Sequence, residues 1–170
     1  MSKAFTRESD DLPDTPAVAR PPSPLPAGAK NYLTPDGADR LREELDRLVE
    51  VERPRIVGLP EDAERKRQLQ MLDQRIRHLQ QSLQTAEVVP APLASEDRVR
   101  FGATVTVRER DGAEARYRIV GVDEIDLDRD WVSWLSPIAK ALLNARLGQW
   151  VRFKFPSGEK ELEIVSVVYE

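Results

Sequence analysis

Three carboxylates stand close together near the middle of the chain, directly after a Gly-Leu-Pro break. They are Glu61, Asp62 and Glu64. Carboxylates on an exposed turn can hold a divalent cation through oxygen ligands while the cation keeps some of its water. Alternatively, they do no chemistry and complement the positive end of a helix dipole. Glu61 and Asp62 are therefore candidate catalytic residues, although no complete set of metal ligands accompanies them and no metal site is predicted.

A run of cations follows these acids immediately. Arg65, Lys66 and Arg67 are consecutive, at the start of an expected helix. Three successive residues of a helix spread over most of its circumference, so they do not form a single stripe. One interpretation is an ordinary solvated surface. The other is a local contact with RNA or another phosphate backbone.

Other groups that could do chemistry are scarce in this sequence. The one histidine, His78, lies between Ile76 and Leu79 with no nucleophile or second metal ligand beside it, and a structural role is predicted for it. There is no cysteine, hence no disulfide and no thiolate metal site. Neither a Gly-rich phosphate loop nor a nucleophile elbow is present. We therefore expect no enzyme activity and no cofactor of the chain's own.

The composition is typical of a bacterial cytoplasmic protein. The 170 residues allow one ordinary domain, or a small one with an appendage. The net charge of −4 argues against general nucleic-acid binding by bulk electrostatics. No apolar run approaches the ~20 residues that a membrane helix needs. The first residues lack the apolar segment of a signal peptide, and the absence of cysteine agrees with a reducing compartment.

The elements that must position these side chains begin with two leucine stripes. The first is Leu41, Leu45 and Leu48, and the second, after Gly58-Leu59-Pro60, is Leu69, Leu72, Ile76, Leu79 and Leu83. Apolar residues three and four apart predict two helices zipped together as an antiparallel coiled-coil hairpin over residues 30–89. The first helix is expected to open at Thr34-Pro35 and run to about Val57, weakened or kinked at Pro54. The second is expected from Glu61-Asp62 to about Glu87.

Proline-rich segments flank this hairpin. Residues 1–29 hold six of the thirteen prolines, which predicts a disordered or polyproline-like tail. An inert tail is one interpretation, and a binding motif is the other. Residues 90–99 are expected to be a short linker.

From residue 100 onward, the spacing of the apolar residues changes from the helical period to alternation, which is typical of strands. Strands are predicted at 104–108, 116–122, 131–135, 150–155 and 162–169. Asp111-Gly112 and Pro156-Ser157-Gly158 predict hairpin turns, and an acidic loop is expected over 123–130. Ser136-Pro137 predicts the start of a helix over 138–145. Together these elements indicate an α+β domain over residues 100–170, with a mainly antiparallel sheet and one helix.

Two tryptophans stand beside the expected helix start. Trp131 and Trp134 are three apart on the expected strand, so we predict that they point to opposite faces of the sheet. An exposed tryptophan at Trp134, next to Ser136-Pro137, would be a good anchor for docking a partner. Core packing is the alternative for either residue.

Several segments, taken in order and with their approximate spacing, resemble the Gre-type bacterial transcript cleavage factors, closest to the GreB branch. They are KNYLTPDG at 30–37, LREEL at 41–45, ERP at 52–54, LDQRIRHL at 72–79, VV at 88–89, FGATV at 101–105, YRIVG at 117–121, SPIAKAL at 136–142 and PSGE at 156–159. The resemblance covers about residues 30 to 170.

This resemblance implies a coiled coil, an FKBP-like C-terminal domain and a partner. Gre factors dock their globular domain on bacterial RNA polymerase at the mouth of the secondary channel, and the coiled coil enters the channel. Acids at its tip help to hold a second magnesium ion in the polymerase active site, which then cleaves backtracked RNA. By position, Asp126, Ser136 and Pro137 fall where the family's docking residues lie. A monomer is expected, contacting RNA or DNA only within the transcription complex.

The sequence departs from the family at the tip of the hairpin. The family's segment of the type Gly-Asp…Glu-Asn-Ala-Asp-Tyr has no counterpart, and the chain is about a dozen residues short, which at ~1.5 Å per residue costs each arm about 9 Å of reach. A carboxylate must lie within ~2–2.5 Å of its ion, directly or through one water. We therefore expect a factor that occupies the channel and modulates elongation, with weak or no stimulation of cleavage.

Three alternatives remain from the sequence. The first is a channel-blocking competitor that resembles the short-coil relatives known as nucleoside diphosphate kinase regulators. The second is an adaptor whose coiled coil binds another helical partner without touching polymerase. The third is prolyl isomerase activity from an FKBP-like fold, which the sequence does not favour because it shows no pattern for an apolar aromatic pocket.

Overall fold

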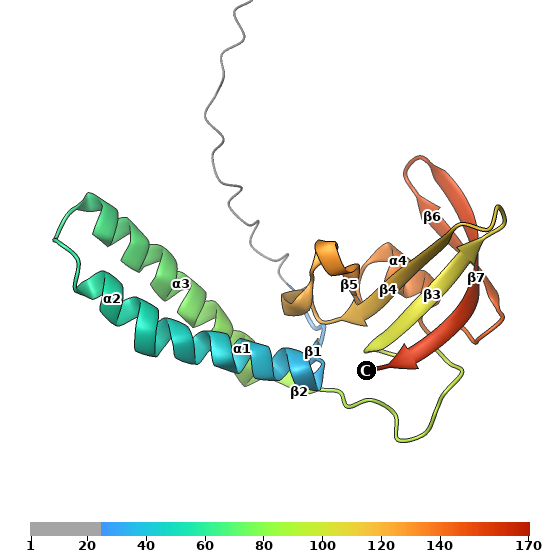
Figure 1. The fold of residues 1–170 in the computed structure, drawn as a ribbon, viewed down its shortest axis with the longest axis horizontal. Coiled ribbons are helices and arrows are strands. Elements are labelled where there is room, and N and C mark those ends of the chain that lie inside the picture. The colour runs from blue at the N-terminus through green and yellow to red at the C-terminus, as the bar shows by residue number, and fades with distance from the viewer. Residues whose placement is uncertain (1–24) are drawn as a thin grey trace, which may run out of the picture.

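The computed structural model describes residues 25–170, arranged as a helical hairpin that extends away from a sheet-containing part (Figure 1). Most of the expected disordered tail therefore lies outside the described residues. The order along the chain is β1 (Asn31–Leu33), α1 (Pro35–Arg47), a π-helical turn (Leu48–Glu52), α2 (Arg53–Val57), α3 (Ala63–Thr85) and β2 (Ala86–Val88), followed by the sheet. The fold class is α+β, as predicted.

The outgoing arm begins where the sequence places it. The Thr34 hydroxyl accepts a hydrogen bond from the Gly37 amide at 3.1 Å, and Pro35 occupies the first helical turn. The expected disturbance at Pro54 takes the form of a π-helical turn rather than a break: the Arg53 amide bonds the carbonyl of Leu48, five residues back. Proline has no amide hydrogen and crowds the carbonyl one turn before it, and the wider turn accommodates both defects while the helix continues.

The returning arm is shorter than expected at both ends. Asp62 caps it, and α3 starts at Ala63. It ends at Thr85 because residues Ala86–Val88 are extended and pair in parallel with β1. This small two-stranded sheet joins the start and end of the hairpin, and the sequence analysis did not predict it.

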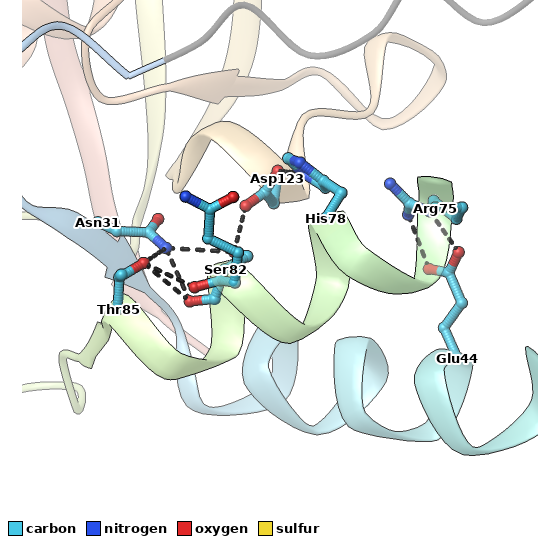
Figure 2. Close-up of polar contacts among 8 residues, drawn as sticks. Asn31, Glu44, Arg75, His78, Ser82, Thr85 and Asp123 are labelled. Carbon is cyan, nitrogen blue, oxygen red and sulfur yellow. Dashed lines mark hydrogen bonds and ion pairs between the residues drawn. The ribbon is translucent and has the colours of Figure 1, made fainter. Parts of the chain in front are cut away.

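The two arms pack through the predicted stripes. The buried cluster comprises Leu33, Ala38, Leu41, Leu48, Ile76 and Leu79, with Leu45, Leu72 and Leu83 partly buried against it. An ion pair with two hydrogen bonds, from Arg75 to Glu44 at 2.8 and 2.9 Å, joins the arms beside this cluster (Figure 2). Nearer the tip, Arg53 contacts Asp73 at 2.9 Å.

The second part of the chain contains a five-stranded sheet. Its strands are β3 (Ala103–Glu109), β4 (Glu114–Val120), β5 (Trp131–Ser133), β6 (Trp150–Phe155) and β7 (Gly158–Tyr169), in the order β5-β4-β3-β7-β6. All neighbours are antiparallel except β4 and β5, which are parallel, so the sheet is mixed. Both predicted hairpin turns are confirmed, between β3 and β4 and between β6 and β7.

One helix, α4 (Pro137–Leu142), packs with the apolar residues of the sheet. The core comprises Val99, Ala103, Val105, Val107, Ile119, Ala139, Leu142, Ala145, Val151, Leu162 and Ile164. The expected helix to residue 145 is too long, because the chain leaves it at Leu143 and Asn144 adopts φ 69°. The expected acidic loop contains two short 3-10 turns, Val122–Glu124 and Leu127–Arg129. Within residues 25–170, no helix is both long and apolar enough to cross a membrane.

Candidate functional site

The acids at the hairpin tip are exposed, and two of them, Asp62 and Glu64, are already engaged. The Asp62 carboxylate accepts a hydrogen bond from the Arg65 amide at 2.7 Å and so caps α3. Glu64 contacts Arg67 at 2.5 Å and Gln68 at 2.9 Å. Among the described residues no group of three or more acids or histidines is arranged to hold a metal ion. The geometry therefore favours the capping interpretation of these acids.

The basic residues after the cap do not form one patch. Lys66 and Arg67 are exposed, Arg65 is half-buried, and Arg67 is paired with Glu64. A shallow hollow of about 530 Å³ at the tip is lined by Glu61, Asp62, Ala63, Arg65, Lys66 and Leu69. A cation in this hollow would therefore face Arg65 and Lys66 as well as the acids.

The predicted docking residues lie on turns around the parallel edge of the sheet. The Asp126 carboxylate accepts a hydrogen bond from the Asp128 amide at 3.1 Å and caps a 3-10 turn. The Ser136 hydroxyl accepts one from the Ala139 amide at 3.3 Å and caps α4, where Pro137 is exposed. In the described part of the chain, both side chains make hydrogen bonds only to backbone amides two or three residues away. They therefore stabilise the two turns, and the surface around Pro137 remains accessible.

The prediction that the two tryptophans occupy opposite faces of one strand is wrong. β5 ends at Ser133, so Trp134 belongs to the turn that follows. Its ring packs edge-on against Tyr32 of β1, with centroids 5.0 Å apart, so this packing contact is not free to anchor a partner. Trp131 instead makes cation–π contacts with three guanidinium groups. Those of Arg40, Arg118 and Arg129 lie 4.5, 4.8 and 5.2 Å from its ring centroid.

A polar junction joins the hairpin to the sheet, and the sequence analysis missed it. Arg118 of β4 donates to both carboxylate oxygens of Asp36 in α1, at 2.9 and 3.1 Å. Burial raises the pKa of the Asp36 carboxyl, but the hydrogen bonds and the charges of Arg118 and Arg40 outweigh that effect and hold the pKa below its usual value.

A buried carboxylate, Glu124, lies beside this ion pair. It accepts hydrogen bonds from the backbone amides of Thr34 at 3.0 Å and Gly121 at 2.9 Å, and from the Thr34 hydroxyl. Arg40 adds a positive charge 3.8 Å away. Glu124 therefore ties the turn before α1 directly to the turn after β4.

A third contact of the junction comes from the returning arm (Figure 2). The buried Asp123 carboxylate contacts the His78 ring nitrogen Nε2 at 2.7 Å and accepts a hydrogen bond from the Ser82 hydroxyl. On the other side of Ser82, the Asn31 amide of β1 donates to the Ser82 carbonyl at 3.0 Å. The lone histidine is therefore structural, as predicted, and its partner lies in the acidic segment after β4.

The sheet carries an apolar cleft that the sequence did not reveal. A hollow of about 250 Å³ is lined by Val107, Glu109, Ala115, Tyr117, Ile138, Phe153, Phe155, Lys160 and Leu162. These residues come from four strands and from α4. The three aromatic rings are separated by up to 38 positions in the sequence, from Tyr117 to Phe155, so no local pattern could predict the cleft.

Comparison with known proteins gives relatives for both parts of the chain. A family model described as "Transcription elongation factor, GreA/GreB, C-term" matches residues 94–169. The transcription elongation factor GreB of Neisseria meningitidis is 42% identical over 154 residues, covering 82% of this chain and 94% of that protein. The transcription elongation factor GreA of Alkalilimnicola ehrlichii is 42% identical over 156 residues, covering 83% and 99%. The crystal structure of the GreA factor homolog Gfh1 of Thermus thermophilus matches at 24% identity, covering 82% of this chain and 99% of that one, with a TM-score of 0.39.

The alignments with the matched relatives leave gaps in this chain. For the GreB match, 82% of 170 residues is about 139, so about 15 of the 154 aligned positions have no residue here. For the GreA match, 83% of 170 is about 141, which again leaves about 15 of 156 positions empty. This chain thus lacks residues at positions that both proteins occupy in the aligned region.

Proposed function

Because this chain belongs to the GreA/GreB family of transcription elongation factors, we propose that it binds bacterial RNA polymerase and modulates the elongation of paused or backtracked complexes. The observation that carries this proposal is the 42% identity to GreB and GreA proteins across nearly their whole lengths. The chain is a partner of a catalyst in this proposal and has no active site of its own.

The proposed mode of action divides the work between the two parts of the protein. The hairpin acts as a coiled coil that enters the polymerase secondary channel, and the FKBP-like sheet domain docks at the channel mouth through Asp126, Ser136 and Pro137. Beyond the polar junction at its base, the hairpin extends away from the sheet, which supports this division (Figure 1). The protein works as a monomer in the cytoplasm, and it meets RNA and DNA only inside the transcription complex, with Arg65, Lys66 and Arg67 nearest to RNA.

We infer that this factor stimulates transcript cleavage weakly or not at all. The deletion of about 15 positions is supported by two relatives, and we place it at the tip, where Gly58-Leu59-Pro60 leads directly into Glu61 and Asp62. Asp62 caps α3, and no metal-ligand group is present among residues 25–170. The magnesium ions stay those of the polymerase, and the tip obstructs the channel instead of adding a ligand.

Two assays on purified proteins test the proposal. Binding to RNA polymerase is measured first, and a chain that recovers no polymerase subunit contradicts the proposed function and favours a coiled-coil adaptor. Cleavage of nascent RNA in stalled complexes is measured second. Robust cleavage that depends on Glu61 and Asp62 contradicts the inference about the tip, whereas displacement of an authentic cleavage factor without cleavage supports a channel-blocking competitor.

The aromatic cleft favours a second candidate function, the binding and prolyl isomerisation of a proline-containing peptide. Three aromatic rings around a hollow of about 250 Å³ suit a proline ring, because proline-rich segments dock on aromatic-lined grooves. A peptide isomerisation assay, with a heat-denatured sample as its background control, tests this candidate. A rate equal to the background removes it.

A further inference from the structure

Leu127 is the most exposed large apolar residue of the sheet-containing part. Its exposed fraction is 80%, and its neighbour two residues back, Ile125, is 45% exposed. Covering an exposed leucine removes apolar surface from water and stabilises the complex. An exposed leucine on an ordered turn is therefore suited to anchor a partner. Leu127 directly follows Asp126, which the resemblance assigns to docking.

The backbone holds Leu127 in a fixed position. Asp126 and Trp131 exchange two backbone hydrogen bonds, at 2.9 and 3.2 Å, and so close the base of the turn. Inside it, the Asp128 amide donates to the Asp126 side chain, and Asp130 adopts the left-handed conformation with φ 57°. The Asp130 carbonyl then accepts from the Arg118 amide at 3.0 Å, which fastens the turn to β4. Because the turn is already ordered in the free protein, binding a partner at Leu127 loses little conformational entropy in ordering it.

The surroundings of Leu127 are acidic. Asp126, Asp128 and Asp130 alternate with Leu127 and Arg129. Arg129 is occupied, since it lies 3.5 Å from the Asp126 carboxylate and over the Trp131 ring. A partner surface that fits this turn combines an apolar socket with cations at its border.

We propose that Leu127 is the apolar anchor of docking, inserted into a cation-bordered socket on RNA polymerase. This inference rests on the proposed function and names the side chain that supplies the docking affinity. Asp128 and Asp130 steer the approach, and the backbone and side-chain hydrogen bonds of Asp126 keep the anchor in place. The tryptophan expected as an anchor, Trp134, is already packed against Tyr32.

The test compares two exposed leucines of the full-length chain. Leu93, on the segment between the two parts, is fully exposed and serves as the matched control. Polymerase affinity is measured by titration for the wild type, Leu127→Ser and Leu93→Ser, with circular dichroism to confirm folding. Leu127→Ser is expected to weaken binding about tenfold, or about 1.4 kcal/mol, and Leu93→Ser is expected to leave it unchanged.

A charge variant provides the second arm. Asp128→Lys is expected to lower the association rate and flatten its dependence on salt, because it reverses the charge beside the anchor. If the wild type binds polymerase and the two leucine variants bind it with equal affinity, the proposal for Leu127 is overturned while the proposed function stands. Absence of wild-type binding removes the proposed function itself, and the two failures are thereby distinguished.

Discussion

Arg118 holds Asp36 through two hydrogen bonds that cross from β4 to α1, and it does so with a guanidinium that is only 5% exposed. Asp36 itself is 49% exposed. The Arg118 side chain is therefore desolvated, whereas the Asp36 carboxylate remains partly solvated. A buried cation without a partner is costly, so this pair favours the observed placement of the hairpin against the sheet.

Asp36→Asn is expected to destabilise the protein by about 1–2 kcal/mol at pH 7, because it leaves the buried Arg118 without its charged partner. The pKa of Asp36 is lowered in the folded protein. Its stabilisation is then complete above the unfolded-state value of ~3.9 and is lost as pH falls through the lower folded-state value. Urea unfolding at several pH values should show the gap between variant and wild type closing in acid.

Asp39→Asn is the control for this measurement. Asp39 is exposed on the same helix and pairs with Arg42 at 2.7 Å, three residues along. Such surface pairs contribute about 0–1 kcal/mol. A loss at Asp39 equal to the loss at Asp36 would show that the buried position of Arg118 has no special effect.

The junction also leaves no room for a side chain at Gly37. A Cβ atom placed there would lie 1.7 Å from the Glu124 carboxylate oxygen Oε1 and 2.8 Å from the Thr34 hydroxyl oxygen. We expect Gly37→Ala to displace Glu124 from its backbone donors and to cost about 1–3 kcal/mol. Thermal unfolding measures this loss.

Gly58→Ala is the matched control at the other end of the hairpin. Its φ of −75° suits any residue, and the nearest atom to a new Cβ is the Arg55 carbonyl oxygen at 3.5 Å. This variant is expected to unfold at the wild-type temperature or slightly above, because alanine reduces the freedom of the unfolded chain. Equal losses at both glycines would mean that the junction tolerates a displaced Glu124.

The elements with strong local signals were predictable from the sequence. The leucine stripes indicate the two arms, Thr34-Pro35 the start of α1, and Asp111-Gly112 a hairpin turn, because each depends on residues within a few positions. The parallel pairing of β1 with β2 was not predictable, since Asn31 and Ala86 are 55 positions apart and each strand has three residues. The end of β5 at Ser133 likewise depends on its pairing with β4.

The site was predictable only in part, for the same reason. The acids at the tip and the turn at Asp126 stand out locally. Glu124 and Asp123 belong to the acidic loop that the sequence predicts, and their burial follows from contacts with Thr34 and with His78 and Ser82, which are 41 to 90 positions away. Contacts of this kind come from the way the hairpin meets the sheet, which no local pattern encodes.

Asp123 is expected to stabilise the junction from the returning arm. Asp123→Ala removes the acceptor of the Ser82 hydroxyl and the partner of the His78 ring, and a buried hydroxyl left without an acceptor costs about 1–3 kcal/mol. Hydrogen exchange should show faster opening near Ser82, with little change at the Glu44–Arg75 contact. Unchanged exchange near Ser82 would contradict a stabilising role for Asp123.

Asp62 offers a way to separate its structural role from a chemical one. Asparagine caps helices about as well as aspartate, whereas alanine does not. Asp62→Asn should therefore keep wild-type stability, and Asp62→Ala should lose about 1 kcal/mol in urea unfolding. Transcript cleavage in stalled complexes should be the same for Asp62→Asn and the wild type, because the carboxylate caps α3 through the Arg65 amide and supplies no metal ligand in the proposed mechanism. A variant that keeps full stability and loses cleavage would assign the Asp62 charge a role in the reaction.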